Sequence, residues 1–315
     1  GDMIEFLLSQ FELETADLYQ VSGPVNLMRI AALYDLVDRP DLKYAPFTPS
    51  VPRAWMQAPD PFEALRRGDI VLHHPFESFS PVVELLRAAA RDPAVLAIKQ
   101  TLYRTGKDSP MAEALIEAAR AGKEVTAVIE LRARFDEETN IDLATRLQEA
   151  GAKVVYGIVG YKTHAKMFLI VRREQGALKR YVHLGTGNYH LRNVRVYTDI
   201  SMLTSDEAIG EDVHNIFQHL TGLGHVSEMK HLLHAPFTVH GTLLDLIEHE
   251  IVAARAGRPA RILAKMNALV DPAIIKALYR ASQAGVAIDL VVRGVCVLRP
   301  GVPGVWRYLF NLNYK

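Results

Sequence analysis

The sequence has little of several features that mark common protein classes. It holds one cysteine, Cys296, in 315 residues, which excludes a disulfide within the chain and a cysteine-rich metal site and fits a reducing compartment. No apolar run approaches the roughly 20 residues of a membrane-spanning helix, and no signal-peptide pattern is present. Lys and Arg total 36, as do Asp and Glu, so an anion-binding site must come from local clusters of basic residues.

Motifs for common metal and nucleotide sites are also missing. There is no His-Glu-x-x-His, no cluster of Cys and His at ligand spacing and no EF-hand loop, so we do not expect a metal held by protein ligands alone. No Gly-x-x-x-x-Gly-Lys-Ser loop occurs, which excludes a P-loop nucleotide site.

The remaining composition is that of a globular protein. Hydrophobic residues make up 49% and charged residues 23%, and the length suffices for two domains. The sequence starts Gly-Asp-Met, from which we expect a fragment of a longer protein. Residues 1–66, with expected helices near 3–10 and 25–35 and a proline-rich connector, are interpreted as the remnant of a preceding helical domain.

Strands and helices are predicted to alternate from about residue 69 onward. Ser80-Pro81 and Ser109-Pro110 each offer an N-cap and a first-turn proline, and Glu174-Gln175-Gly176 is expected to close a hairpin. The pattern predicts a mixed sheet with helices over its faces. Strands are expected over 70–74, 94–103, 125–131, 153–158, 164–172, 181–184, 197–203, 260–269 and 286–292, and helices over 82–91, 111–121, 141–150, 206–220, 243–254 and 272–283.

Two segments of the chain are weakly similar. Each has a helix that ends at a glycine and leads into a strand, and the two glycines, Gly122 and Gly285, are 163 positions apart. We interpret them as parts of two related lobes, residues 67–225 and 226–315, although two unrelated helix–glycine–strand units remain an alternative. A counterpart of His164 would then fall near position 327, beyond the last residue, so we expect half of a two-histidine site.

The segment Tyr161-Lys162-Thr163-His164-Ala165-Lys166 is the most informative in the chain. On a strand, residues two apart face the same side, so His164 and Lys166 would place an imidazole beside an ammonium. The turn Gly185-Thr186-Gly187-Asn188 would add an amide and close backbone. A nucleophilic imidazole surrounded by donors suits attack on phosphorus; the alternative is a solvated strand edge.

Arginines end two of the predicted strands. Arg104 follows one strand, and Arg132 and Arg134 follow the next; ligands of α/β sheets bind beyond such carboxyl ends. The guanidinium fork matches phosphate oxygens, and we favour Arg134 over Arg132. Pairing with the acidic residues at 136–138 is the alternative.

Two further residues are candidates because of their place near a strand start. Asp199 could hydrogen-bond to the ring of His164 and fix its tautomer; pairing with Arg195 is the alternative. Tyr197 could stack on a base or donate to phosphate, or be an ordinary core tyrosine.

Together these motifs resemble bacterial polyphosphate kinase of the first type, whose core has the phospholipase D fold. The resemblance covers about three quarters of the chain. It is carried by His73-His74-Pro75-Phe76-Glu77-Ser78-Phe79, Ala97-Ile98-Lys99-Gln100-Thr101-Leu102-Tyr103-Arg104, the run from Glu130 to Ile141, Lys162-Thr163-His164-Ala165-Lys166, His183-Leu184-Gly185-Thr186-Gly187-Asn188-Tyr189, Tyr197-Thr198-Asp199 and Val292-Arg293-Gly294-Val295-Cys296.

The resemblance implies reversible transfer of the ATP γ-phosphate onto polyphosphate through a phosphohistidine. It implies an α/β fold, with phospholipase D-like mixed sheets flanked by helices, in two related lobes of which the second is incomplete. It also implies the site residues. These are His164 as the phosphorylated nucleophile, Asp199 as its carboxylate partner, Arg104 and Arg134 at the phosphate and Mg²⁺ site, Lys166 and Asn188 as phosphate ligands, and Tyr197 and Arg293 as ATP/ADP contacts.

Some of the chain departs from this family pattern. Residues 305–315 do not look like the family, and we expect impaired activity in this chain. The two alternatives are a phospholipase D-type phosphodiesterase, although Val171 stands where that motif has Asp, and a non-catalytic polyanion-binding module. We expect polyphosphate and ATP/ADP as partners, no nucleic acid, a homo-oligomer in the full-length protein and a cytoplasmic location, with peripheral attachment to the inner membrane as an alternative.

Overall fold

The computed structural model describes residues 2–45, 47–103, 109–130, 137–158, 160–222, 228–299 and 301–302. By its internal contacts the chain divides into two compact units, residues 1–48 and 49–315. The first predicted boundary lay after residue 66, and the three predicted domain ranges stay a prediction. Two short helices lie near the predicted boundary, α3 (Arg53–Met56) and α4 (Pro61–Arg67). They contribute Trp55, Phe62 and Leu65 to the core of the larger unit.

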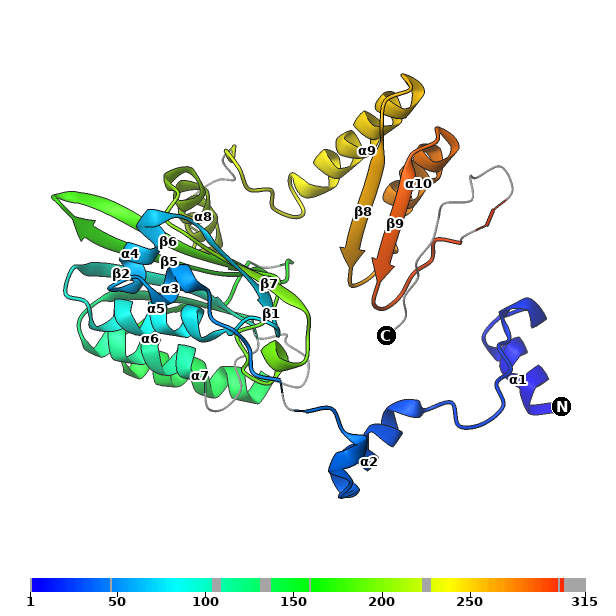
Figure 1. Cartoon of the computed structure of the whole chain (residues 1–315), viewed down its shortest axis with the longest axis horizontal. Coiled ribbons are helices and arrows are strands. Elements are labelled where there is room, and N and C mark those ends of the chain that lie inside the picture. Colours follow the sequence, from blue (N-terminus) through cyan, green and yellow to red (C-terminus); the bar gives the residue numbers. More distant parts are fainter. Residues whose placement is uncertain are drawn as a thin grey trace. The chain divides into compact units, whose positions relative to one another are not determined.

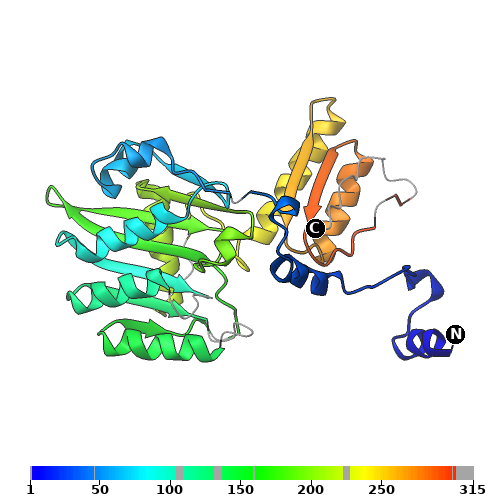
Figure 2. The same ribbon diagram turned by 60° about the horizontal axis from the view of Figure 1, so that its bottom comes forward.

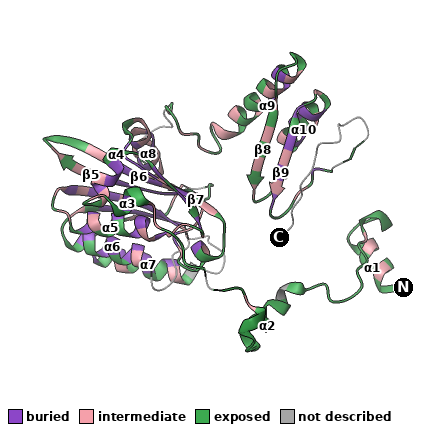
Figure 3. Cartoon of the chain, viewed as in Figure 1, coloured by how far each residue is buried: buried purple, intermediate pink, exposed green. Residues whose placement is uncertain are grey.

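The smaller unit consists of short helical segments. α1 (Asp2–Gln10) confirms the helix predicted near 3–10. The helix predicted over 25–35 is mostly a 3₁₀ segment, Leu27–Ala32, followed by one turn of α2 (Leu33–Leu36). None of the residues described in this unit is buried, and Figure 3 shows it almost entirely in the colour of exposed residues.

A seven-stranded mixed sheet forms the centre of the larger unit. Its strand order is β1-β7-β6-β5-β2-β3-β4, with parallel pairing only between β2, β3 and β4. This confirms the predicted α/β class with a mixed sheet. The strands are β1 (Ile70–His74), β2 (Val95–Leu102), β3 (Glu124–Ile129), β4 (Lys153–Val155), β5 (Lys166–Glu174), β6 (Ala177–Gly185) and β7 (Asp199–Thr204).

The apolar run in β5 is explained by burial of both faces of this strand. Phe168 and Ile170 belong to the larger core, whereas Met167 and Leu169 belong to a separate core on the opposite face. A strand covered on both sides is apolar throughout rather than at every second position.

Helices cover the two faces of this sheet. α5 (Ser80–Arg91), α6 (Pro110–Arg120) and α7 (Glu137–Glu149) lie side by side along one face (Figures 1 and 2). α8 (Glu207–Leu220) packs Val213 and Phe217 against the other face.

The carboxyl-terminal part of the larger unit has its own core. β8 (Arg261–Met266) and β9 (Ala287–Val292) pair in parallel, with α9 (Val239–Arg255) and α10 (Pro272–Gln283) packed on them. β9 begins and ends 163 positions after β3, the offset that the two glycines predicted.

The predicted N-cap of α5 and the predicted start of β5 are both wrong. Ser80 is not an N-cap: α5 begins at Ser80 itself, after Phe79, and the Ser80 N–H donates to the Ser78 hydroxyl. β5 begins at Lys166 rather than at His164, because the backbone just before it bonds to side chains instead of to a neighbouring strand.

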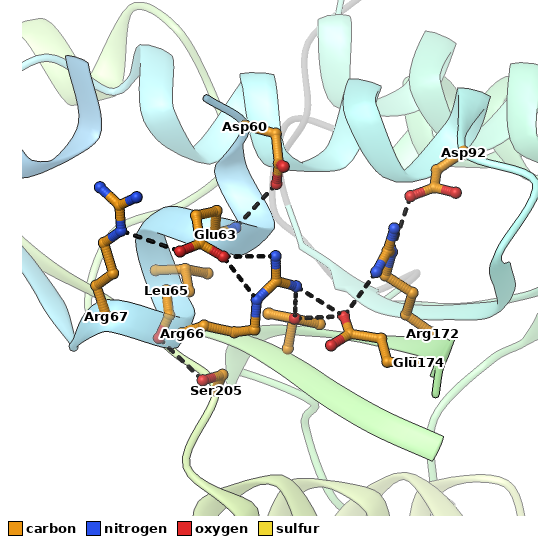
Figure 4. Close-up of polar contacts among 10 residues, drawn as sticks. Asp60, Glu63, Leu65, Arg66, Arg67, Asp92, Arg172, Glu174 and Ser205 are labelled. Carbon is orange, nitrogen blue, oxygen red and sulfur yellow. Dashed lines mark hydrogen bonds and ion pairs between the residues drawn. The ribbon is translucent and has the colours of Figure 1, made fainter. Parts of the chain in front are cut away.

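Polar contacts join the hairpin of β5 and β6 to the helices above it. The Arg172 guanidinium donates to Asp92, at 2.8 Å, and to Glu174, at 2.8 Å, and Arg66 from α4 donates to the same Glu174 oxygen (Figure 4). Burial alone would raise the pKa values of Asp92 and Glu174, but hydrogen bonds and the nearby arginines outweigh it, so both pKa values are lowered. Carboxyls with lowered pKa values stabilise the fold above their unfolded pKa of about 4 and lose that contribution as the pH falls through the folded values.

We predict that Arg172→Met lowers the free energy of unfolding at pH 7 by about 2 kcal/mol, because two largely buried carboxylates lose their shared cation. Below about pH 4 its stability should fall less steeply than that of the unchanged chain. Urea unfolding between pH 3 and pH 7 measures both effects. Arg173→Met changes the exposed neighbour on the same strand and should leave the profile unchanged; identical profiles for the two variants would contradict the assignment.

Candidate active site

One edge of the seven-stranded sheet gathers most of the predicted site residues. The carboxyl ends of β2 and β3 lie beside the amino end of β5, since β2 pairs in parallel with β3 and antiparallel with β5. The same edge holds the end of β6 and the start of β7, because Lys166 pairs with Gly185 and Gly185 pairs with Ser201.

The loop that carries His164 is held by a buried acid. Glu130, directly after β3, is 7% exposed, and its Oε2 accepts from the Thr163 backbone N–H at 2.7 Å. Thr163 also lies against Gly157, where an added Cβ would come within 2.7 Å of the Thr163 Oγ1. Thr163 is therefore fixed on both sides, which limits where the next residue, His164, can lie.

The ring of Tyr103 packs against this loop. Its ring meets the His164 ring edge to face, with 5.0 Å between centroids. The Lys166 Nζ lies 5.1 Å and the Lys162 Nζ 5.5 Å from the centre of the Tyr103 ring, distances at which a cation is attracted to an aromatic face. Imidazole and ammonium groups thus gather around one phenol ring.

The structure therefore brings His164 and Lys166 together by a different route from the one predicted. His164 is exposed and precedes the strand, while Lys166 is 6% exposed and its Nζ donates to the His164 carbonyl oxygen at 2.5 Å. Thr101 closes the arrangement by donating from Oγ1 to the Ala165 carbonyl at 2.7 Å.

The side-chain amide of Asn140 links the ends of β2 and β3. The Asn140 Nδ2, from α7, donates to the carbonyl oxygens of Tyr103 at 3.0 Å and Glu130 at 2.9 Å. Asn140 is 1% exposed, so both of its N–H groups are used away from water.

Asp199 is the first residue of β7, at the same edge of the sheet, and its carboxylate bonds to another residue than His164. In the described part of the chain its carboxylate accepts from the Thr186 Oγ1, at 2.9 Å, rather than from the His164 ring. Gly187 lies against this carboxylate: an added Cβ would lie 2.4 Å from the Asp199 Oδ2. A side chain at Gly187 would displace this carboxylate, so the glycine is required by close approach. The role of Asp199 as the partner of His164 stays a prediction.

Asn188 lies in the turn after β6. Its Oδ1 is buried and has no hydrogen-bond partner among the residues that the structure describes. The predicted contact of this amide with phosphate stays a prediction.

Tyr197 and Arg293, both predicted as nucleotide contacts, are brought together. The Arg293 guanidinium lies 5.0 Å from the centre of the Tyr197 ring. Beside them the Lys265 Nζ donates to the Thr198 Oγ1 at 2.6 Å. Tyr197 is 43% exposed, so it is not an ordinary core tyrosine.

Some predictions fall on residues that the structure does not describe. Arg104, Arg132 and Arg134 lie outside the described residues, as does the tail from residue 305 onward. In the part that is described, no group of three or more His, Cys, Asp or Glu side chains could hold a metal ion. Within the same described residues, no helix combines the length and the apolar character that a membrane span requires.

Sequence reasoning missed the residues that support the loop. Glu130, Tyr103 and Asn140 all lie within motifs that were recognised, yet none was given a role. A signal for Glu130 was present, since an acid directly after a buried apolar strand needs a hydrogen-bond partner. Nothing in the sequence shows that this partner is the Thr163 amide.

Comparisons with known proteins agree with these motifs. A family model described as polyphosphate kinase C-terminal domain 1 matches residues 60–226, and one described as polyphosphate kinase C-terminal domain 2 matches residues 232–309. A polyphosphate kinase of Pseudomonas aeruginosa is 60% identical over 304 residues, which are 96% of this chain and 44% of that protein. One of Burkholderia lata is 59% identical over 307 residues, 96% of this chain and 45% of that protein.

A solved structure is similar over nearly the whole chain. The crystal structure of polyphosphate kinase from Porphyromonas gingivalis superimposes with a TM-score of 0.80 and 36% identity. The match covers 92% of this chain and 48% of that one. The chain thus spans less than half the length of the relatives it matches.

We predict that Asn140→Asp lowers the free energy of unfolding by about 3 kcal/mol at pH 7, because a carboxylate would face two carbonyl oxygens that now accept hydrogen bonds. The loss should shrink as the pH falls and the new acid becomes protonated, since it could then donate one bond. Urea unfolding at pH 7 and pH 4.5 measures this. Gln148→Glu adds the same charge at an exposed position of α7 and should change stability little; equal losses in both variants would contradict the contact.

Proposed function

Since the chain belongs to the polyphosphate kinase family, we propose that it carries the phosphohistidine centre of an ATP:polyphosphate phosphotransferase, with His164 as the nucleophile. The observation that supports this most is the setting of His164. Its ring is exposed at the sheet edge, while the backbone on either side is held by Glu130, Thr101 and Lys166. A nucleophile needs this combination of an accessible ring and a fixed position.

The proposed reaction has two reversible steps. A ring nitrogen of neutral His164 attacks the γ-phosphorus of ATP, so that a nitrogen–phosphorus bond forms, the bond to the bridging oxygen breaks and ADP leaves. A terminal oxygen of polyphosphate then attacks the same phosphorus, the nitrogen–phosphorus bond breaks and neutral imidazole returns. Asp199 is proposed to hold the other ring nitrogen in both steps.

Cations compensate the charge on the transferring phosphoryl group. Lys166 is largely buried with its ammonium over the Tyr103 ring, and Lys162 supplies a second ammonium over the same ring. We propose that Arg104 and Arg134 complete this set and that Asn188 donates to a phosphate oxygen.

Mg²⁺ fits this site only as a companion of the phosphates. Arginine and lysine repel a metal ion, and the described residues offer no cage of metal ligands. Mg²⁺ commonly keeps several waters and binds substrate phosphates. When bound to them it neutralises oxygen charge, and the side chains named above then position the phosphates.

Two other functions were open at the sequence level. A phospholipase D-type phosphodiesterase is disfavoured because Val171 contributes to an apolar core on β5 where that motif requires an acid. A module that binds polyanions without turnover shares the same cations and is separated by experiment. We also propose a homo-oligomer for the full-length protein, a cytoplasmic location and no nucleic-acid partner.

We predict that incubation with γ-labelled ATP and Mg²⁺ gives acid-labile, base-stable label on this chain, because phosphoramidates hydrolyse in acid. His164→Ala should abolish the label. His249→Ala, which removes an exposed histidine of α9, should not. Release of product from a lipid or DNA diester would support the phosphodiesterase instead, and retention of polyphosphate without label would support the binding module.

We predict that Tyr197→Leu weakens ATP binding about tenfold, because the proposed contact of the ring with the base is lost. Tyr197→Phe retains the ring and should bind nearly as well as the unchanged chain. Equilibrium binding of ATP to the three chains measures this. Tyr279→Leu, which removes a tyrosine of α10 whose hydroxyl donates to Arg299, is the control; equal losses at both positions would exclude a specific contact.

A further inference from the structure

Two buried histidines take no part in the proposed chemistry. His74, at the end of β1, and His183, on β6, are each 1% exposed. β7 lies between these strands, and its Ser201 hydroxyl lies between the rings. The Ser201 Oγ is 2.9 Å from the His74 Nε2 and 3.0 Å from the His183 Nε2.

The outer nitrogens of both rings also have partners. The His74 Nδ1 is 2.9 Å from the Glu77 carbonyl oxygen, and the His183 Nδ1 is 2.7 Å from the Tyr189 Oη. The contacts form one continuous hydrogen-bond network across three strands, from Tyr189 through His183 and Ser201 to His74.

The donor and acceptor of every hydrogen bond in this network follow from the Glu77 carbonyl oxygen at one end of it. A carbonyl oxygen can only accept, so the His74 Nδ1 donates to Glu77 and the neutral ring accepts at Nε2. Ser201 must then donate to His74 and accept from the His183 Nε2–H. His183 therefore accepts at Nδ1, and Tyr189 donates to it.

Burial keeps His183 and Tyr189 neutral. Desolvation, with a contribution from His74, lowers the pKa of His183 to about 3, and desolvation raises the pKa of Tyr189. Near neutral pH the His183 ring therefore offers one donor and one acceptor, and the Tyr189 hydroxyl keeps its proton.

This hydrogen-bond network supports the turn of residues 185–188. An added Cβ at Gly185 would lie 3.0 Å from the His183 Cε1, so the first residue of the turn rests on the imidazole ring. Tyr189, the residue after the turn, is bonded to the same ring. Phe168 stacks on the His183 ring, at 5.1 Å between centroids and 27° between planes.

We propose that His183 is a positioning residue that fixes the Gly185–Asn188 turn beside His164, with Tyr189, Ser201 and His74 setting its tautomer and orientation. This rests on the proposed function, since the turn carries Asn188 and Thr186, which bonds to Asp199. His183 acts through the turn and touches no reacting atom.

Histidine tautomers in the ¹⁵N-labelled chain test the network without any phosphoryl transfer. Two-bond nitrogen–proton correlations should show His183 with its proton on Nε2 and His74 with its proton on Nδ1. In Tyr189→Phe the His183 Nδ1 resonance should move toward that of an unbonded nitrogen, and amide exchange at Thr186–Asn188 should become about tenfold faster.

Tyr181→Phe is the matched control. Tyr181 is a fully buried tyrosine in the middle of β6, bonded to Glu174 rather than to His183, so loss of its hydroxyl should destabilise the fold without changing the turn amides. Ser205→Ala serves in the same way for Ser201→Ala, because the Ser205 hydroxyl is also buried but donates to Leu65.

Labelling of His164 by γ-labelled ATP gives the functional readout. Tyr189→Phe and Ser201→Ala should slow it about tenfold, whereas the two controls should not. A His183 proton on Nδ1, a charged His183 at pH 7, or turn amides unchanged in Tyr189→Phe would overturn the proposal. Absence of label on the unchanged chain would refute the proposed function, and the spectra would still decide whether the network exists.

Discussion

The backbone N–H of Thr163 donates to a buried carboxyl oxygen of Glu130, and the candidate site depends on this bond. The ladder of β5 starts only at Lys166, so no strand neighbour fixes the residues just before it. A buried acid without a partner is costly, and the amide satisfies it. The same hydrogen bond therefore satisfies the buried acid and positions the loop that carries His164, the proposed nucleophile.

Around this bond the site is assembled from strand ends rather than from a long flexible loop. β2 contributes Tyr103, β3 contributes Glu130 and β7 contributes Asp199, while Asn140 from α7 ties the first two together. The strands that lead to these residues are buried, which gives a rigid frame. Positive charge comes from Lys162 and Lys166, whose ammonium groups both lie over the Tyr103 ring.

Strands and helices with a clear hydrophobic period were predictable from the sequence. Tyr197 and Arg293, both named through the family resemblance, lie together, and their contact with a nucleotide stays a prediction. β1 and α10 match the predicted limits. The start of β5 was not predictable, because the backbone around Ala165 bonds to the side chain of Thr101, which lies 64 residues away. The burial of His183 and His74 was not predictable for a similar reason, since each ring nitrogen Nε2 bonds to Ser201, which lies on another strand.

The hydrogen bonds from Tyr189 to His74 all run in the same direction. Each interior member gives one proton and takes one, so a single link cannot be reversed alone. Reversing one would force the others to reverse and would move the His74 proton to Nε2, so that the unprotonated Nδ1 would face the Glu77 carbonyl oxygen, two acceptors with no proton between them. The support beneath the turn is therefore cooperative: it holds as a whole or fails as a whole.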